Sequence, residues 1–271
     1  MFYTEAQIDR KADKRSDPDF IAARLSNPGT MLLPVWRGQN LIDDTADTPR
    51  AGGFSIAEGG MLLEEGGDTV FLGDADGRAY FAVDVSSHDE PNEVAHFSER
   101  GEFQNLRDVG AAMSQADGAL LAFGRGVFAW HETHGFCPRC GAPSEMRDGG
   151  HRRQCTSCVA SQYPRIDPAV IMLVRRGDRV LLGHNQRRPA KWFSCFAGFV
   201  EIGETLEDAV AREVFEEAGV KTTEVKYFAS QPWPFPSSLM LGYFADSPEG
   251  DPKPDMEEIV ETRWFTKDEI R

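Results

Sequence analysis

Two cysteine pairs in the middle of this chain of 271 residues constrain its fold more than any other feature. The first pair is Cys137 and Cys140, the second is Cys155 and Cys158, and fourteen residues separate them. Each pair can present two thiolates to one tetrahedral ion, and the stretch between the pairs suits a β-hairpin. Because four thiolates close the coordination sphere of zinc, a structural zinc site is favoured over a redox dithiol or four unrelated buried cysteines.

Other metal-ligating side chains lie near the pairs or stand alone. His131, His134 and His151 are close enough in the sequence to replace a cysteine ligand, but we expect none of them to do so. Cys195 has neighbours typical of a core strand, which predicts a buried, inert thiol rather than a nucleophile.

The cysteine segment divides the chain into three zones, which we expect to be domains at 1–130, 131–164 and 165–271. The first zone alternates short apolar runs with turns and carries no motif that indicates chemistry, so a structural or dimerising role is its simplest interpretation. The third zone alternates strands with a helix, which is typical of a layered α/β fold. The expected elements are strands at 30–36, 70–72, 79–85, 169–175 and 179–183, turns at 73–77 and 176–178, and helices at 116–131 and 205–218.

Composition narrows the class of protein. A formal net charge of −15 argues against a protein that binds nucleic acid through a broad basic surface. An acidic enzyme with an anionic substrate needs cations at its site, which makes a bound metal an early expectation. No apolar run approaches the ~20 residues of a membrane helix, and the polar N-terminus lacks a secretory apolar region. We therefore expect a soluble, cytoplasmic protein.

The stretch from Gly198 to Val220 predicts a capped helix with an acidic side. Thr205 can cap its start and Gly219 can end it. Three glutamates lie three and four residues apart, so they project from one side of the helix, where like charges destabilise it by ~0.2–0.5 kcal/mol per pair. A divalent cation such as Mg²⁺ would compensate, since it prefers carboxylates. A solvated acidic helix face is the alternative to a metal site. The three glutamates of this face are Glu213, Glu216 and Glu217.

The same stretch resembles the Nudix box, G-x5-E-x7-R-E-U-x-E-E-x-G-U with U aliphatic. All nine specified positions match: Gly198, Glu204, Arg212, Glu213, Val214, Glu216, Glu217, Gly219 and Val220. The resemblance implies an α/β/α sandwich in which the three glutamates carry the metals. It also implies that Glu204 and Arg212 brace the loop through an ion pair.

A proline-rich stretch at 230–240 narrows the substrate. Its prolines exclude a helix or a central strand and fix an extended loop that displays Trp233 and Phe235. These rings form either a wall for a planar base, where stacking is worth ~1–3 kcal/mol, or a rigid connection that covers a hydrophobic core. The stretch resembles the S-Q-P-W-P-F-P-x-S signature of NADH diphosphatases, in which a tetracysteine module also precedes the catalytic domain.

The resemblance to NADH diphosphatases implies an N-terminal Nudix-like domain without catalytic residues, a zinc ribbon, a catalytic Nudix domain and a homodimer. It implies that Phe199 and Tyr163 sandwich the nicotinamide ring, and that Trp233, Gln231 and Ser237 contact substrate. The alternative for Phe199 is core packing, and the alternative for Tyr163 is an ordinary strand entry.

A further metal-binding carboxylate is expected downstream of the Nudix box. Glu258 matches the family position, although Glu257 and Glu261 are alternatives. The family continues some tens of residues past the segment that matches Trp264, with an apolar C-terminal helix. Since this chain stops at Arg271, part of the adenine pocket and of the dimer contact is expected to be missing from it.

These features together predict Mg²⁺- or Mn²⁺-dependent hydrolysis of the pyrophosphate of NADH, and of NAD⁺, to NMNH or NMN and AMP. One alternative keeps the chemistry and removes the NAD cap from RNA 5′ ends, with RNA held by a local basic patch. The basic patch that would hold RNA consists of Arg139, Arg147, Arg152 and Arg153. A second alternative is a non-catalytic binding module that works through its zinc ribbon.

Overall fold

The computed structural model describes residues 1–45 and 47–270, which divide into two compact units. The first unit contains residues 1–165 together with 233–237. The second contains residues 166–232 and the chain from 238 onward. No helix among the described residues is long and apolar enough to cross a membrane.

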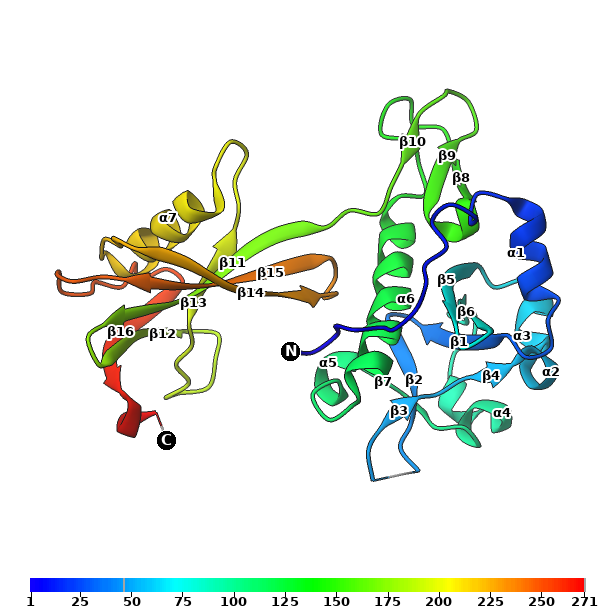
Figure 1. Cartoon of the computed structure of the whole chain (residues 1–271), viewed down its shortest axis with the longest axis horizontal. Coiled ribbons are helices and arrows are strands. Elements are labelled where there is room, and N and C mark those ends of the chain that lie inside the picture. The colour runs from blue at the N-terminus through cyan, green and yellow to red at the C-terminus, as the bar shows by residue number, and fades with distance from the viewer. Residues whose placement is uncertain (46, 271) are drawn as a thin grey trace. The chain divides into compact units, whose positions relative to one another are not determined.

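A seven-stranded mixed sheet forms the centre of the first unit (Figure 1). Its strands follow the order β3-β2-β1-β6-β5, with β4 paired to β1 and β7 to β2, and β1 runs parallel to β6. The strands are β1 (Met31–Trp36), β2 (Gln39–Asp43), β3 (Arg50–Ala51), β4 (Phe54–Ser55), β5 (Thr69–Ala75), β6 (Arg78–Asp84) and β7 (Glu102–Gln104).

Helices cover both faces of this sheet, because apolar side chains point alternately to either side of its strands. On β6, Ala82 packs in the cluster under the long helix α6 (Gln115–Thr133), whereas Phe81 and Val83 pack in a cluster on the other face. The shorter helices are α1 (Pro18–Leu25), α2 (Ile56–Gly59), α3 (Met61–Glu64), α4 (Ala95–Ser98) and α5 (Leu106–Val109), with a 3₁₀ turn η1 (Pro91–Glu93).

The predicted elements of this unit are confirmed with one correction. The helix expected at 116–131 is α6, which begins after Ser114, whose side chain accepts a bond from the Asp117 amide. The turn expected at 73–77 is shorter, because β5 continues to Ala75. Asp74 belongs to that strand, since its main chain pairs with Asp9.

The zinc-ribbon segment is a three-stranded antiparallel sheet within the first unit. It consists of β8 (Ser144–Arg147), β9 (Arg152–Cys155) and β10 (Ser161–Gln162), with the 3₁₀ turn η2 (Asp148–Gly150) between the first two. The β-hairpin expected between the cysteine pairs is therefore confirmed.

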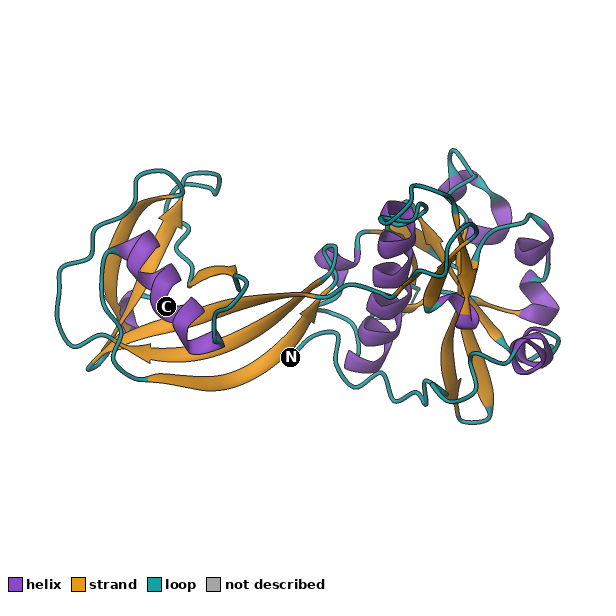
Figure 2. Ribbon diagram, turned by 90° about the horizontal axis from the view of Figure 1, so that it is seen from above, coloured by secondary structure: helices purple, strands orange, loops and turns teal. Residues whose placement is uncertain are grey.

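The second unit is a six-stranded mixed sheet with one helix, α7 (Leu206–Ala218), along one face (Figure 2). The order is β14-β15-β11-β12-β16, with β13 paired to β11. Within residues 166–232 and 238–270, α7 is the one α-helix, so this part does not contain the second helical layer expected of a sandwich. The remaining elements are β11 (Asp167–Arg176), β12 (Arg179–Asn185), β13 (Phe196–Phe199), β14 (Val225–Trp233), β15 (Ser238–Asp246), β16 (Ile259–Thr266) and η3 (Lys267–Glu269).

Candidate active site and zinc centre

The four predicted zinc ligands come together at one end of the ribbon. All four Sγ atoms lie within 4.8 Å of one another, and three of the S···S separations are 3.4, 3.6 and 3.7 Å. A tetrahedron with Zn–S bonds of ~2.3 Å has S···S edges of ~3.8 Å, so the cluster fits one zinc ion. The ligands are Cys137, Cys140, Cys155 and Cys158.

Backbone amides support thiolate character in this cluster. The amides of Ser157 and Cys158 donate to Cys155 Sγ at 3.3 and 3.2 Å. Chiefly through the Cys158 amide, these bonds lower the pKa of Cys155 to about 6. On the other pair, Gly141 adopts a left-handed φ of 76° and donates its amide to the Cys137 carbonyl at 2.8 Å.

The three neighbouring histidines each lie within hydrogen-bonding distance of a backbone carbonyl oxygen. His131 Nε2 lies 2.8 Å from the Gly150 carbonyl oxygen, and His151 Nε2 lies 2.7 Å from that of Phe71. His134 Nδ1 lies 2.9 Å from the Trp130 carbonyl oxygen. These three rings therefore serve the packing of the first unit.

Three of the four ribbon arginines do not form the open basic patch considered above. Arg147 pairs with Glu145, and Arg152 pairs with Asp148 at 2.8 Å. Arg153 donates to the Ser144 carbonyl at 2.7 Å and contacts His131 Nδ1 at 3.1 Å. Among the described residues, Arg139 is the one of the four without a hydrogen bond or ion pair. A basic track for RNA on the ribbon is accordingly weak.

The sequence of α7 explains where the helix lies and which way it faces. Thr205 accepts a hydrogen bond from the Asp208 amide at 3.2 Å, and Gly219 ends the helix with a left-handed φ of 67°. Ala209, Val210 and Val214 are fully buried under the sheet. This stripe fixes the rotation of the helix, so its acidic residues are placed by the core.

Two of the three predicted metal-binding glutamates pack against β13. A Cβ at position 198 would collide with the carboxylate of Glu213, which gives a physical reason for Gly198 in the Nudix box. Glu217 is 7% exposed and accepts a bond from the Ala197 amide. Glu216 lies nearer the solvent, with its side chain 56% exposed.

Arg212 joins the loop to the acidic helix. Its guanidinium donates to Glu204 at 2.6 and 2.9 Å, which is a bidentate pair, and to the Phe199 carbonyl at 2.9 Å. It also reaches Glu213 at 2.8 Å and Glu216 at 3.0 Å. The Arg212 bonds, with the Glu201 amide, lower the pKa of Glu204 to about 2. This is the bracing ion pair that the Nudix resemblance implies.

Glu217 carries the electrostatic signature of a cation site. Burial, followed by the charges of Glu213, Glu258 and Asp255, raises its pKa to about 8. Its Oε2 atom is buried and has no hydrogen-bond partner among the described residues. Such an oxygen is costly unless a cation approaches it. A hard divalent cation fits this donor set of carboxylates.

The carboxylates are less tightly gathered than the thiolates. The cysteine cluster is the one group of three or more His, Cys, Asp or Glu ligands that lies so close together in residues 1–45 and 47–270. Two of the carboxylates, those of Glu213 and Glu216, are ion-paired with Arg212 at 2.8 and 3.0 Å.

Glu258 is held by residues that the sequence did not indicate. Asn185 Nδ2 donates to Glu258 Oε1 at 3.1 Å. Asp255 Oδ1 accepts the amides of Glu257, Glu258 and Ile259 at 2.8, 3.0 and 2.9 Å and shapes the turn before β16. Asn185 is distant in sequence and reaches Glu258 through the pairing of β12 with β16, which is irregular at this point. No spacing rule could have found it.

The predicted substrate contacts lie in both units. Phe199, at the end of β13, and Tyr163, just after β10, are 61% and 66% exposed, so neither ring is packed in a core. Gln231 lies on β14 and Ser237 precedes β15. Trp233 and Phe235 are half-buried against the core under α6, so the structure shows the packing alternative for both rings. Cys195 is half-buried just before β13 rather than fully buried within a strand, and burial raises the pKa of its thiol, which disfavours a nucleophilic thiolate.

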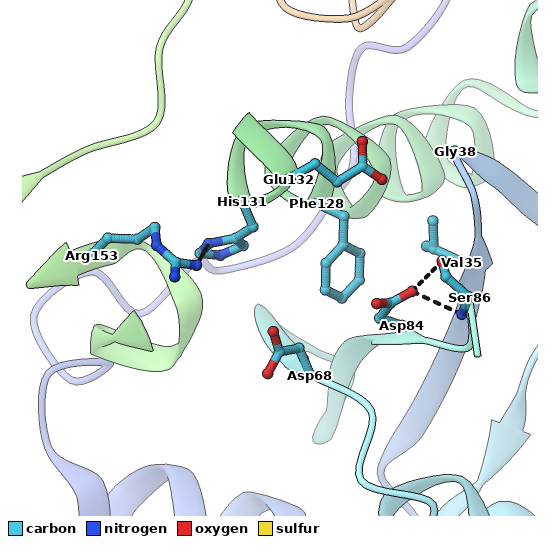
Figure 3. A pocket seen from close by; sticks show the side chains of 9 residues that line it. All are labelled: Val35, Gly38, Asp68, Asp84, Ser86, Phe128, His131, Glu132 and Arg153. Carbon is cyan, nitrogen blue, oxygen red and sulfur yellow. Dashed lines mark hydrogen bonds between the residues drawn. The ribbon is translucent and has the colours of Figure 1, made fainter. Parts of the chain in front are cut away.

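A cavity of about 250 Å³ lies in the first unit, and none of the predicted substrate residues lines it. Figure 3 shows Asp84 bonded to Ser86 and Arg153 turned toward His131 at its margin. These charged groups already have partners within the wall. The cavity therefore does not add a second catalytic constellation to the Nudix helix.

Comparison with known proteins gives consistent assignments along the chain. Residues 165–271 match the NUDIX domain, 132–163 the NADH pyrophosphatase zinc ribbon domain, and 29–130 the NADH pyrophosphatase-like rudimentary NUDIX domain. The chain is 32% identical to the NAD-capped RNA hydrolase NUDT12 of Homo sapiens, over 99% of this chain and 67% of that protein. It is 37% identical to the NAD-capped RNA hydrolase NudC of Stutzerimonas stutzeri, over 86% of this chain and 80% of that protein. A NUDIX hydrolase structure from Nitrosomonas europaea aligns with a TM-score of 0.44 at 28% identity, over 49% of this chain and 78% of that one.

The mixed sheet, the braced acidic helix and the matched NUDIX domain define a Nudix hydrolase. With a zinc ribbon and a rudimentary domain before it, in that order, the chain belongs to the NADH pyrophosphatase family of these enzymes.

Proposed function

We propose that this enzyme hydrolyses the pyrophosphate bond of NADH, and of NAD⁺, in the presence of Mg²⁺ or Mn²⁺. Water adds to one phosphorus and the bridging P–O bond breaks, which yields NMNH or NMN and AMP. The observation that carries the proposal is Glu217, a buried carboxylate with an unpartnered oxygen beside Glu213 and Glu258. A carboxylate pocket of this kind suits divalent cations that accompany phosphate groups.

Different residues of the chain would bind the cations, brace the helix and contact the substrate. Glu213, Glu216, Glu217 and Glu258 would hold the cations, which supply charge neutralisation and lower the pKa of the attacking water. Arg212 keeps the loop and the helix in place through Glu204. Phe199 and Tyr163 would stack on the nicotinamide, with Gln231 and Ser237 as further contacts. Zinc on the four cysteines is structural.

Removal of the NAD cap from RNA is the second candidate. The names of two relatives, NAD-capped RNA hydrolases of Homo sapiens and Stutzerimonas stutzeri, favour it. The net charge of −15 and the internally paired ribbon arginines favour the free dinucleotide. Comparing kcat/KM for NADH with that for NAD-capped RNA at one salt concentration separates the two.

Three further features belong to the proposal. The chain would work as three domains, at 1–130, 131–164 and 165–271. It would act as a homodimer and in the cytoplasm. Size-exclusion chromatography with light scattering tests the oligomeric state.

A substrate panel with two matched variants tests the chemistry. The panel contains NADH, NAD⁺, ADP-ribose and diadenosine polyphosphates, each with Mg²⁺ or Mn²⁺. Glu217→Gln should lower kcat by at least ~10²-fold, because the metal-binding charge is lost while the shape is kept. Glu207→Gln, an exposed position on the same helix, should leave kcat within about twofold. Equal activities of these two variants on NADH, or no turnover of any substrate by the parent chain, would contradict the proposal.

A further inference from the structure

The loop between β14 and β15 belongs to a different unit from the strands it joins. Residues 233–237 group with the first unit, whereas the chain before and after them groups with the second. This is the proline-rich stretch that carries Trp233 and Phe235 and lies between Gln231 and Ser237. Side chains of the first unit hold this loop.

Three aromatic rings form the contact. Trp233 and Phe235 pack edge to face, with ring centroids 5.1 Å apart. Tyr3 meets both of them, at 6.4 Å from Trp233 and 5.8 Å from Phe235. Because each ring touches the other two, the loop is held by a closed cluster.

Two arginines from the first unit lie against the same rings. The Arg107 guanidinium lies 5.5 Å from the Trp233 centroid and 5.8 Å from that of Phe235. Arg125 lies 4.6 Å from Phe235 and is fixed by a 2.6 Å bond from its Nε to the Gly38 carbonyl. Cations over aromatic faces are attractive. Together with Tyr3, these arginines enclose the two rings.

The first unit fixes the position of Tyr3. The Tyr3 ring is 5% exposed, and its hydroxyl donates to the Leu106 carbonyl at 3.0 Å. A Cβ at Gly110 would collide with the Tyr3 hydroxyl. The placement of Tyr3 is therefore specific.

We infer that the first unit, which contains the rudimentary N-terminal domain, positions this loop for catalysis, with Tyr3, Arg107 and Arg125 as positioning residues. The domain would thereby fix the two residues at the ends of the loop, Gln231 and Ser237. The link to substrate binding rests on the proposed function, while the anchoring itself does not. This gives the domain a role although it carries no catalytic motif.

Hydrogen exchange on the full chain tests the anchoring. Arg107→Ala removes an exposed side chain, and Tyr3→Leu removes the ring while it keeps apolar volume. Both should speed amide exchange in peptides covering 231–239 by roughly tenfold and leave α7 and the ribbon unchanged. Arg37→Ala is the matched control, because Arg37 lies over Trp36 in the same unit and does not touch the loop. Unchanged exchange at 231–239 in Arg107→Ala, whether or not Tyr3→Leu folds, overturns the anchoring.

Kinetics with NADH test the positioning role. In the same two variants KM should rise by roughly tenfold with kcat within about twofold, the pattern of lost ground-state binding, and Arg37→Ala should match the parent. Faster exchange with unchanged KM and kcat would overturn positioning. If the parent chain does not hydrolyse NADH, the proposed function fails, and the exchange experiment still decides the anchoring.

Discussion

The position of the Glu258 carboxylate shows how much of this site depends on single residues outside the Nudix box. Asn185 donates to its Oε1 atom, and Asp255 fixes the main chain on either side. A carboxylate held in one orientation loses less freedom on binding a cation than a free one. We therefore expect Asn185 to act through Glu258 and not to bind the cation itself.

Replacing Asn185 should weaken cation binding without unfolding the protein. Asn185→Ala removes the bond to Glu258, and outer contacts of this kind typically contribute 10–100-fold in metal affinity. We expect Mn²⁺ dissociation constants, measured by electron paramagnetic resonance on the whole chain, to rise at least roughly tenfold. Asn27→Ala, at an exposed asparagine of the first unit, is the control. An unchanged Mn²⁺ affinity with an unchanged Tm would remove Asn185 from the site.

At the scale of elements, local signals determined what the sequence could predict. The ends of α7 followed from Thr205 and Gly219, and the ribbon hairpin followed from the cysteine spacing. Both are short-range features. The position of Asn185 beside Glu258 depends on long-range strand pairing, and the enclosure of Trp233 depends on Tyr3, 230 residues earlier. Such contacts leave no periodic mark in the sequence, which is why the sequence leaves a stacking wall and a packed connection as open alternatives for these rings.

The ribbon should depend on zinc for its fold. Its buried residues include Cys137 and Cys155 but few large apolar side chains, so metal binding has to supply most of its stability. Zinc binding to structural sites contributes about 10–16 kcal/mol.

Removing the zinc should therefore unfold the ribbon and spare the second unit. Cys140→Ser should release zinc, detected with a colorimetric chelator, and should open 137–158 to limited proteolysis. The sheet around α7 should remain resistant, because its core contains no zinc ligand. Intact protection of 137–158 after complete zinc loss would contradict this dependence.

At the scale of the whole molecule, each unit has its own core, and the first includes two buried histidines, His131 on α6 and His151, which bonds to Phe71 on β5. Burial lowers the pKa of His131 and of His151 to about 4. The pKa shift of Glu217 in the second unit has the opposite sign, since burial raises this pKa to about 8. The stability of the chain should consequently depend on pH through groups in both units.

Acid should destabilise the first unit well before its carboxylates are protonated. Between pH 6.5 and about 4 the unfolded chain binds protons at His131 and His151 that the folded chain does not, so stability falls as pH is lowered through this window. Each histidine contributes up to about 1.4 kcal/mol per pH unit. In the metal-free protein Glu217 opposes one of them, because its folded form holds an extra proton from pH 4.5 to about 8. His151→Gln keeps a donor for the Phe71 carbonyl and cannot titrate. Urea unfolding at pH 6.5, 5.5 and 5.0 should give a slope of ΔG against pH that is lower by about 1.4 kcal/mol per unit in this variant. Parallel curves for the variant and the parent would show that His151 does not enter the fold as a neutral ring.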